Sequence, residues 1–300
     1  MASGPEREGS GDLMLKWCLK RHFPFGAGMS DTYEGEVSAL ARGLAVLRYV
    51  GEAEVPVALK DLSEGTGIPK PTASRLVTTL LGAGLLRKAT HSDRFELGPG
   101  VMALASAFLR NLDFRALARP HMLRFAERVG LSVHLGVRDR LEMVLVETVR
   151  PMSAAIVMRI GVGGRLGLAR SALGRAYMAA LDDDARESLI AGLKISSGDR
   201  WPEDAANLPP ALAHFRTHGY AISMGDWHPD INAIASPLVM PDGEIYALNC
   251  GGPAFKLPEA FLRDTVAPEL IMCVEAIAAE SGATRIGKGG KDPRTLPGNQ

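Results

Sequence analysis

The chain has 300 residues, 46% hydrophobic and 23% charged, and its 34 Lys and Arg residues balance 34 Asp and Glu residues. This excludes a fibrous or wholly disordered chain and leaves room for two hydrophobic cores. Apolar runs stay shorter than the ~18 residues of a membrane span and no signal peptide is apparent, so we expect a soluble, cytoplasmic protein without a membrane partner. A net charge of zero argues against a nucleic-acid partner unless the charges are unevenly distributed.

The first part of the chain has the pattern of a small helical domain. Residues 1–35 are rich in Gly, Ser and charge and are expected to form a disordered tail. Apolar spacing then predicts helices over 37–51, 58–64 and 70–81, the last two joined by Gly65-Thr66-Gly67. Two short extended segments follow, over 85–88 and 94–97. This order predicts a winged helix-turn-helix DNA-binding domain over residues 36–98.

The rest of the chain alternates strands with helices. Residues 99–113 are expected to hold a linker helix, 114–281 an effector-binding domain with a mainly antiparallel sheet, and 282–300 a disordered tail. The fold class is therefore α+β. Strands are predicted over 131–137, 141–148, 155–160, 220–224, 231–240 and 244–250, and helices over 101–109, 115–128, 171–181, 185–193, 208–218 and 258–280.

The third helix has an outward face suited to a DNA groove. Its apolar stripe leaves Lys, Thr, Ser and Arg side chains facing out, with no acid among them. Such side chains can bond base edges and phosphates, and the basic hairpin can lie over the adjacent strand. Between Lys70 and Arg94 five bases face Asp93 alone, so the zero net charge hides a basic surface. The predicted DNA-binding residues are Lys70, Thr72, Ser74, Arg75, Thr78, Arg87, Lys88 and Arg94. The alternative is that the helix face and the hairpin are merely solvated.

Two stretches of this domain, 41–47 and 67–80, resemble the IclR-type bacterial transcription regulators. In that family a small residue, usually Ser, follows the Pro-Lys pair, whereas Pro71 stands there in this chain and has no hydroxyl for a phosphate. The family's role in DNA contact is therefore carried over only to Lys70, Thr72, Ser74 and Arg75. The resemblance extends over residues 37–279 and implies a GAF-like second domain that binds small organic or aromatic acids.

In the second domain the resemblance lies in segments 166–176, 219–223, 232–237 and 247–253. This chain has Ala169 and Arg170 where the family often has His and Ala, and Asn249-Cys250-Gly251 replaces its common Ser-x-Ser. The resemblance and the local chemistry together suggest the following effector-binding residues: Arg170, Ser171, Ala172, Leu173, Asp226, Asn232, Ala233, Ile234, Asn249 and Gly251.

Ser171 lies at a predicted helix start, where free N–H groups and the helix dipole favour a carboxylate. Arg170 beside it could add a bidentate pair to the same anion. The alternative is that Arg170 points to solvent or pairs with a neighbouring acid. Asp226 and Asn232 could border the pocket and bond a hydroxyl of the effector.

Asp226, His228 and Asp230 alternate along the chain, so on an extended segment they could share a side and hold a metal or perform acid–base chemistry. The alternative is a polar loop before a strand. The cysteines at 18, 250 and 273 lack disulfide or zinc-ligand spacing, and Cys250 has no local base to activate it as a nucleophile.

The leading hypothesis is a ligand-responsive transcriptional regulator that binds double-stranded operator DNA and a carboxylic-acid effector as a homo-dimer or tetramer, with no cofactor, metal or catalytic residue. One rival is an enzyme acting on small acids. The other is a protein-binding winged helix with a structural second domain.

Overall fold

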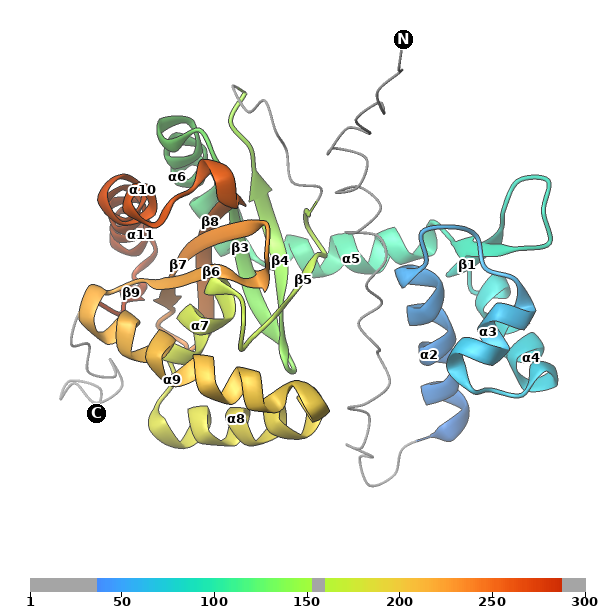
Figure 1. The fold of residues 1–300 in the computed structure, drawn as a ribbon. Helices are drawn as coiled ribbons and strands as arrows, with labels where there is room; N and C mark the ends of the chain where they lie inside the picture. The colour runs from blue at the N-terminus through green and yellow to red at the C-terminus, as the bar shows by residue number, and fades with distance from the viewer. Residues whose placement is uncertain (1–36, 153–159, 288–300) are drawn as a thin grey trace, which may run out of the picture. The chain divides into compact units, whose positions relative to one another are not determined.

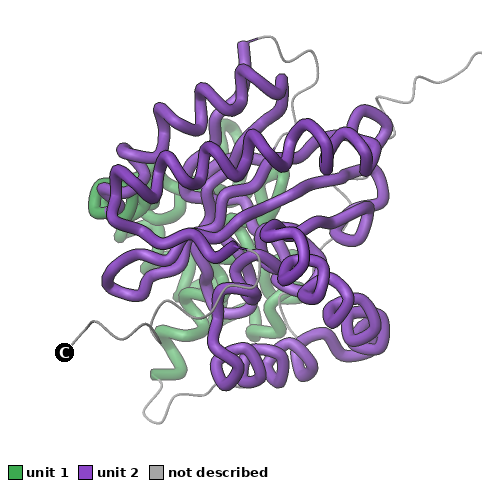
Figure 2. The backbone as a smooth tube through the Cα atoms, turned by 90° about the vertical axis from the view of Figure 1, so that its left-hand side faces the viewer, with its two compact units in different colours: residues 1–111 green, residues 112–300 purple. Residues whose placement is uncertain are grey.

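A computed structural model describes residues 37–152 and 160–287. The chain divides into two compact units, residues 1–111 and 112–300 (Figure 2). The predicted N-terminal tail lies outside the described residues, as do most of the predicted strand 155–160 and residues 288–300. No helix in the described ranges is long and apolar enough to cross a membrane.

The first unit has the predicted helix, helix, turn, helix, hairpin order. Gly67 adopts a left-handed conformation with φ +68°, which lets the chain reverse between the second and third helices. Val46, Leu62 and Val77, one from each helix, pack in the core. The elements are α2 (Ser38–Glu52), α3 (Leu59–Thr66), α4 (Lys70–Gly82), β1 (Leu86–Lys88), β2 (Phe95–Leu97) and α5 (Gly100–Arg110).

The second unit is built on a seven-stranded sheet in which every pair of neighbouring strands is antiparallel. Its main path runs β5-β4-β3-β8-β7-β6, and β9 pairs with β7. The strands are β3 (Ser132–Asp139), β4 (Glu142–Val149), β5 (Arg165–Gly167), β6 (Ala221–His228), β7 (Ile231–Val239), β8 (Ile245–Pro253) and β9 (Thr284–Arg285). The helices are α6 (Asp113–Val129), α7 (Ala172–Ala179), α8 (Asp183–Ser197), α9 (Trp201–His218), α10 (Glu259–Phe261) and α11 (Ala267–Ser281).

Helices cover both faces of this sheet. Helices α6 and α11 pack on one face, and α7 and α9 pack on the other (Figure 1). Side chains alternate between faces along each strand, so Ala233 and Ala235 of β7 join the core under α7, whereas Ile234 points to the opposite face. The sheet therefore separates two cores, and the one beneath α7 borders the pocket described below.

The described elements differ from the sequence expectations in several places. Helix α9 begins at Trp201 rather than at 208, because Pro209 and Pro210 resemble the start of a helix yet lie inside this one. Strand β5 has three residues, too few for a clear alternation, and was not predicted. The last predicted helix contains a π-helical segment, 262–266, between α10 and α11. Within the predicted C-terminal tail, Thr284 and Arg285 pair with β7.

Candidate functional site

The outward face of α4 carries polar and basic side chains on a rigid helix. Ala73, Val77 and Leu80 bury the opposite side of the helix in the core of the first unit. Lys70 and Arg75 are exposed, and neither forms an ion pair with another described residue. Four further positions of this face follow the predicted pattern: Ser74, Thr78 and Thr79 are exposed and Thr72 is half-buried. The face thus presents two unpaired cations and several hydroxyls to solvent.

The three cations of the hairpin are placed differently. Arg87 pairs with Glu96 at 3.0 Å across the two strands, and Lys88 pairs with Asp93 at 2.8 Å. The hydrogen bond and charge of Lys88 lower the pKa of Asp93. Exposed pairs of this kind are weak, so both cations remain available to a phosphate.

Arg94 instead ties the hairpin to the helical part of the unit. Its guanidinium donates to the Pro56 carbonyl at 3.1 Å and to the Asp61 carboxylate at 3.3 Å. The same Asp61 carboxylate accepts the Ala58 N–H at the start of α3. Arg94 therefore has a structural task that the sequence pattern did not reveal.

The second unit contains a pocket beneath the N-terminus of α7, with an empty volume of about 430 Å³ that includes space open to solvent. Its lining is mostly apolar with a few polar groups, and comes from α7, strands β3 to β8 and the segment before β5. The lining residues are His134, Leu145, Ile160, Leu166, Ser171, Ala172, Ser223, Trp227, Ile231, Ala233, Asn249 and Gly251.

Ser171 caps helix α7 at the pocket wall. Its hydroxyl accepts the Gly174 N–H at 3.0 Å and donates to the Gly167 carbonyl at 2.7 Å. The N–H groups of Ala172 and Leu173 have no acceptor among the described residues. Two free backbone donors and the positive end of a helix dipole make this wall a suitable place for an anion.

His134 and Asn249 form a polar row across the sheet at the base of the pocket. They are paired in register on β3 and β8, and both are more than nine-tenths buried. The His134 Nδ1 lies 3.1 Å from the Thr148 hydroxyl on β4. Burial and, to a smaller extent, the charge of Arg150 lower the pKa of His134 to about 4, so its ring is neutral at pH 7. The buried Asn249 Oδ1 has no hydrogen-bond partner in the described ranges of the chain.

The structure differs from the sequence expectation at Arg170, which does not line the pocket. Its guanidinium donates to Asp204 at 2.5 Å and to Glu203 at 2.8 Å, both on α9. Arg170 therefore follows the alternative expectation, in which it pairs with neighbouring acids instead of forming a bidentate pair with the effector's carboxylate. Because these acids lie more than thirty residues along the chain, local sequence could not identify them.

Asp226 and Asn232 are also engaged outside the pocket lining. Asp226 accepts a hydrogen bond from Arg175 at 2.7 Å, and that arginine, which is 4% exposed, also bonds the carbonyls of Ala169 and Ile222. The Asn232 amide donates to the Leu257 carbonyl at 2.9 Å. Both polar groups therefore support the fold around the pocket, and the expectation that they bond an effector stays a prediction.

Two further residues expected to bind the effector, Leu173 and Ile234, are not among the residues that line the pocket. Leu173 is fully buried and packs against Gly136 of β3, and Ile234 points to the opposite face of the sheet. The expected residues that do line the pocket are Ser171, Ala172, Ala233, Asn249 and Gly251.

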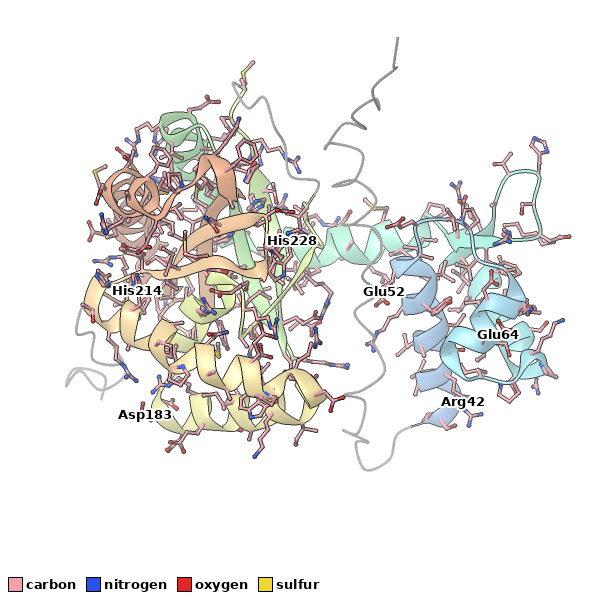
Figure 3. All side chains as sticks on the ribbon, viewed as in Figure 1. Arg42, Glu52, Glu64, Asp183, His214 and His228 are labelled. Atoms are coloured by element: carbon pink, nitrogen blue, oxygen red, sulfur yellow. The ribbon has the colours of Figure 1, made fainter. Side chains whose placement is uncertain are left out.

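The sequence reasoning missed several lining residues, most notably His134 and Trp227. His134 alternates with Val133 and Leu135, so its position on the face opposite these two apolar residues could have marked it. Trp227 lies in β6, which continues to His228 (Figure 3), where a polar loop was expected. The signal there was weak because Gly225, with φ +76°, interrupts the strand pattern.

Neither metal nor thiol chemistry gains support from the geometry. Asp226 is held by Arg175, and the described residues contain no group of three or more His, Cys, Asp or Glu side chains able to hold a metal. Burial raises the pKa of the Cys250 thiol, with a smaller contribution from Cys273, which disfavours the thiolate needed for nucleophilic attack.

Two family models match the chain. Residues 39–89 match the IclR helix-turn-helix domain, and residues 106–279 match the bacterial transcriptional regulator IclR C-terminal domain. Among curated relatives, the transcriptional regulator TsaQ1/TsaQ2 of Comamonas testosteroni is 34% identical over 86% of this chain and 93% of its own length. The acetate operon repressor of Salmonella typhimurium is 25% identical over 84% and 92% respectively. These relatives are transcriptional regulators and not enzymes.

Solved structures give the same result. An IclR family transcriptional regulator from Brucella abortus is 37% identical, with a TM-score of 0.73 over 86% of this chain and 97% of that chain. An IclR homologue from Microbacterium hydrocarbonoxydans, solved with 4-hydroxybenzoate, is 25% identical, with a TM-score of 0.59 over 80% and 100% respectively.

Proposed function

Because the chain belongs to the IclR family of DNA-binding bacterial transcriptional regulators, we propose that it is a ligand-responsive regulator whose α4 reads an operator and whose pocket binds a small organic acid. Ligand binding in the second unit would change operator affinity, and DNA binding would change ligand affinity by the same factor. The observation that carries the DNA part is the exposed, acid-free face of α4 with its unpaired Lys70 and Arg75.

In this proposal α4 lies in the major groove. Arg75 reaches a guanine edge or a phosphate, Ser74 and Thr78 bond base edges or phosphates, and Lys70 contacts the backbone near the helix start. Arg87 and Lys88 exchange their weak ion pairs for phosphates of the adjacent strand. Arg94 is proposed to contact the DNA backbone as well, because its ion pair with Asp61 is also exposed, although its bonds to Pro56 and Asp61 tie it to the helical part of the domain.

Fluorescence anisotropy with the DNA upstream of the protein's own gene tests this assignment. Arg75→Ala should lower operator affinity and reduce discrimination against unrelated DNA, by a factor of about 10 if a base contact worth 1–3 kcal/mol is lost. Lys88→Ala should weaken binding nearly evenly across sequences. Arg216→Ala, an exposed base on α9, is the control and should change neither. Unchanged binding in both test variants would overturn the groove assignment.

The effector is proposed to be a small, mainly apolar acid. The free N–H groups at the start of α7 suit its carboxylate, and Leu145, Leu166 and Trp227 suit a hydrocarbon or aromatic body. The relative solved with 4-hydroxybenzoate supports an aromatic acid as one possibility. A thermal-shift screen of aromatic and short-chain acids tests this, since a ligand that binds only the folded state raises its melting temperature. No shift with any acid would contradict the proposal.

The functional unit is proposed to be a homodimer or a homotetramer. Helix α5 buries none of its side chains, and Met102, Leu104 and Phe108 on it are 51–66% exposed. Leu104 and Phe108 are four residues apart and therefore share one face of the helix, and an exposed apolar face indicates a protein interface. A second copy of the chain is the proposed partner, because two-fold symmetry would present two reading helices to a pseudo-palindromic operator.

A further inference from the structure

We propose that Asn249, with His134 beside it, selects effectors that carry a hydroxyl group away from the carboxylate. This inference rests on the proposed function, because it concerns the ligand of the same pocket. It assigns a specificity-determining role to two side chains at the base of the pocket, on the sheet rather than on helix α7.

The Asn249 side chain is the least satisfied polar group in the pocket. It is 8% exposed, and its fully buried Oδ1 has no hydrogen-bond partner among the described residues. Other buried polar groups nearby are satisfied: the Ser171 and Ser223 hydroxyls donate to the carbonyls of Gly167 and Arg170. A buried polar atom without a partner is costly, so a ligand group that bonds Asn249 gains affinity.

The hydrogen-bonding atoms of Asn249 and His134 limit which kind of ligand group can bond them. The amide of Asn249 offers one acceptor and two donors, and the neutral ring of His134 has one nitrogen beyond the one beside Thr148. A hydroxyl both donates and accepts, so it can donate to the Asn249 Oδ1 and accept from the amide or from the ring. A second carboxylate only accepts and cannot satisfy the Oδ1, and a hydrocarbon satisfies neither end.

No cation is among the described lining residues at this end, although the charge of Arg150 acts on His134. No Lys or Arg lines the pocket, because Arg170 is bonded to Glu203 and Asp204, and Arg175 is bonded to Asp226. The start of α7 is thus the one anion-favouring wall among the described lining residues. Burying a second charge beside Asn249 without a partner would be unfavourable.

Calorimetric titration of the full-length protein with matched pairs of acids tests the inference. The probes are benzoate against 3- and 4-hydroxybenzoate, and butyrate against 4-hydroxybutyrate. The wild-type protein should bind the best hydroxylated acid at least about 10-fold more tightly than its parent, since one satisfied buried hydrogen bond is worth that much. Terephthalate, with a second carboxylate in place of the hydroxyl, should bind more weakly than benzoate.

Variants then assign the preference to Asn249. In Asn249→Leu the hydroxyl preference should fall below about 3-fold while the parent acid still binds, because the unsatisfied amide is gone. Ser236→Ala is the matched control. Ser236 is a buried polar residue on β7 whose hydroxyl also lacks a hydrogen-bond partner within the described part of the chain, but it points to the opposite face of the sheet. It should retain the full preference.

The outcomes separate this inference from the proposed function. If parent and hydroxylated acids bind wild-type protein equally, water rather than ligand bonds Asn249, and the inference is wrong while the acid pocket stands. A preference that survives in Asn249→Leu also overturns it. If no acid in the panel binds, the proposed effector class itself fails. The comparison of acids on wild-type protein needs no variant to fold.

Discussion

Ser171 combines two tasks at one residue, capping α7 and bordering the proposed anion site. Asn and Asp are both good helix caps, whereas Ala is not. Ser171→Asn and Ser171→Asp should therefore fold normally, and Ser171→Ala should lose about 1 kcal/mol of stability. The new carboxylate of the Asp variant would occupy the free N–H groups of Ala172 and Leu173 and repel the ligand's carboxylate.

We therefore expect the Asn variant to keep the thermal shift with an acid that stabilises the wild type, and the Asp variant to lose it. The two variants differ in charge but hardly in size, so a difference between them reports on the charge. A full shift in Ser171→Asp would place the carboxylate elsewhere in the pocket.

His134 predicts how stability responds to pH. Its folded pKa of about 4 lies below the ordinary value of 6.5, because burial penalises the charged ring. Between these values the unfolded chain takes up a proton that the folded protein excludes. Stability from this residue is fully present above pH 6.5 and is lost progressively down to pH 4, by a total of about 3 kcal/mol.

Urea unfolding at pH 7.5, 6.0 and 5.0 measures this loss, and His134→Gln should flatten the profile over that range. His91→Gln, on the exposed hairpin, serves as the control and should retain the wild-type slope. If His134→Gln keeps the same slope as the wild type, another group causes the pH dependence.

At the scale of elements, the position of α7 depends on the absence of a side chain at Gly174. A Cβ there would lie 2.3 Å from the backbone Cα and carbonyl oxygen of Leu168, which cannot move as a side chain could. Gly174→Ala should push the helix away from the pocket wall and cost about 1–3 kcal/mol. Thermal unfolding and acid binding should both be impaired.

Gly167→Ala on β5 is the matched control, because a Cβ there meets no atom within 4 Å and the backbone has no positive φ. It should change stability by no more than about 0.5 kcal/mol. Equal effects of the two substitutions would show that close packing of α7 is not what Gly174 provides.

Elements with strong local signals could be predicted from the sequence, and those defined by distant partners could not. Apolar periodicity placed α4 at Lys70–Gly82 to within a residue of the prediction, because its stripe faces a core built from its neighbours in sequence. The start of α7 followed in the same way from the cap at Ser171.

The pocket lining was harder to predict, because it brings together segments separated by more than a hundred residues. The pairing of Arg170 with α9 and the position of His134 beside Asn249 depend on sheet register, which no local pattern contains. The resemblance to a family supplied the segments around the pocket but not the direction in which each side chain points.

At the scale of the whole molecule, the neutral net charge takes on a specific meaning for a DNA-binding regulator. Within the proposed DNA-binding surface, Lys70 and Arg75 of α4 face solvent without an ion pair to a described residue, while Arg87, Lys88 and Arg94 are partly neutralised by acids. The small number of free cations on this surface limits its sequence-independent affinity for phosphates. Specific binding then depends on the DNA-binding domains of two subunits acting together. The oligomer is therefore essential to the proposed function.

The proposed dimer gives the last prediction. Replacing Phe108 by Glu would place a charge on the exposed apolar face of α5 that Phe108 shares with Leu104. If a second copy covers this surface, Phe108→Glu should shift the protein toward monomer in sedimentation, because a buried unpaired charge opposes association.

Operator binding should fall with it, since a monomer contacts one half-site instead of two, while the melting temperature of the second unit and its acid binding remain near wild type. Phe255→Glu, at an apolar residue of the second unit that is 75% exposed, is the control for adding an acid to an exposed phenylalanine. A Phe108→Glu protein whose oligomer mass and operator affinity equal those of the wild type would show that α5 is not the interface. The two DNA-binding domains would then have to be joined through another surface.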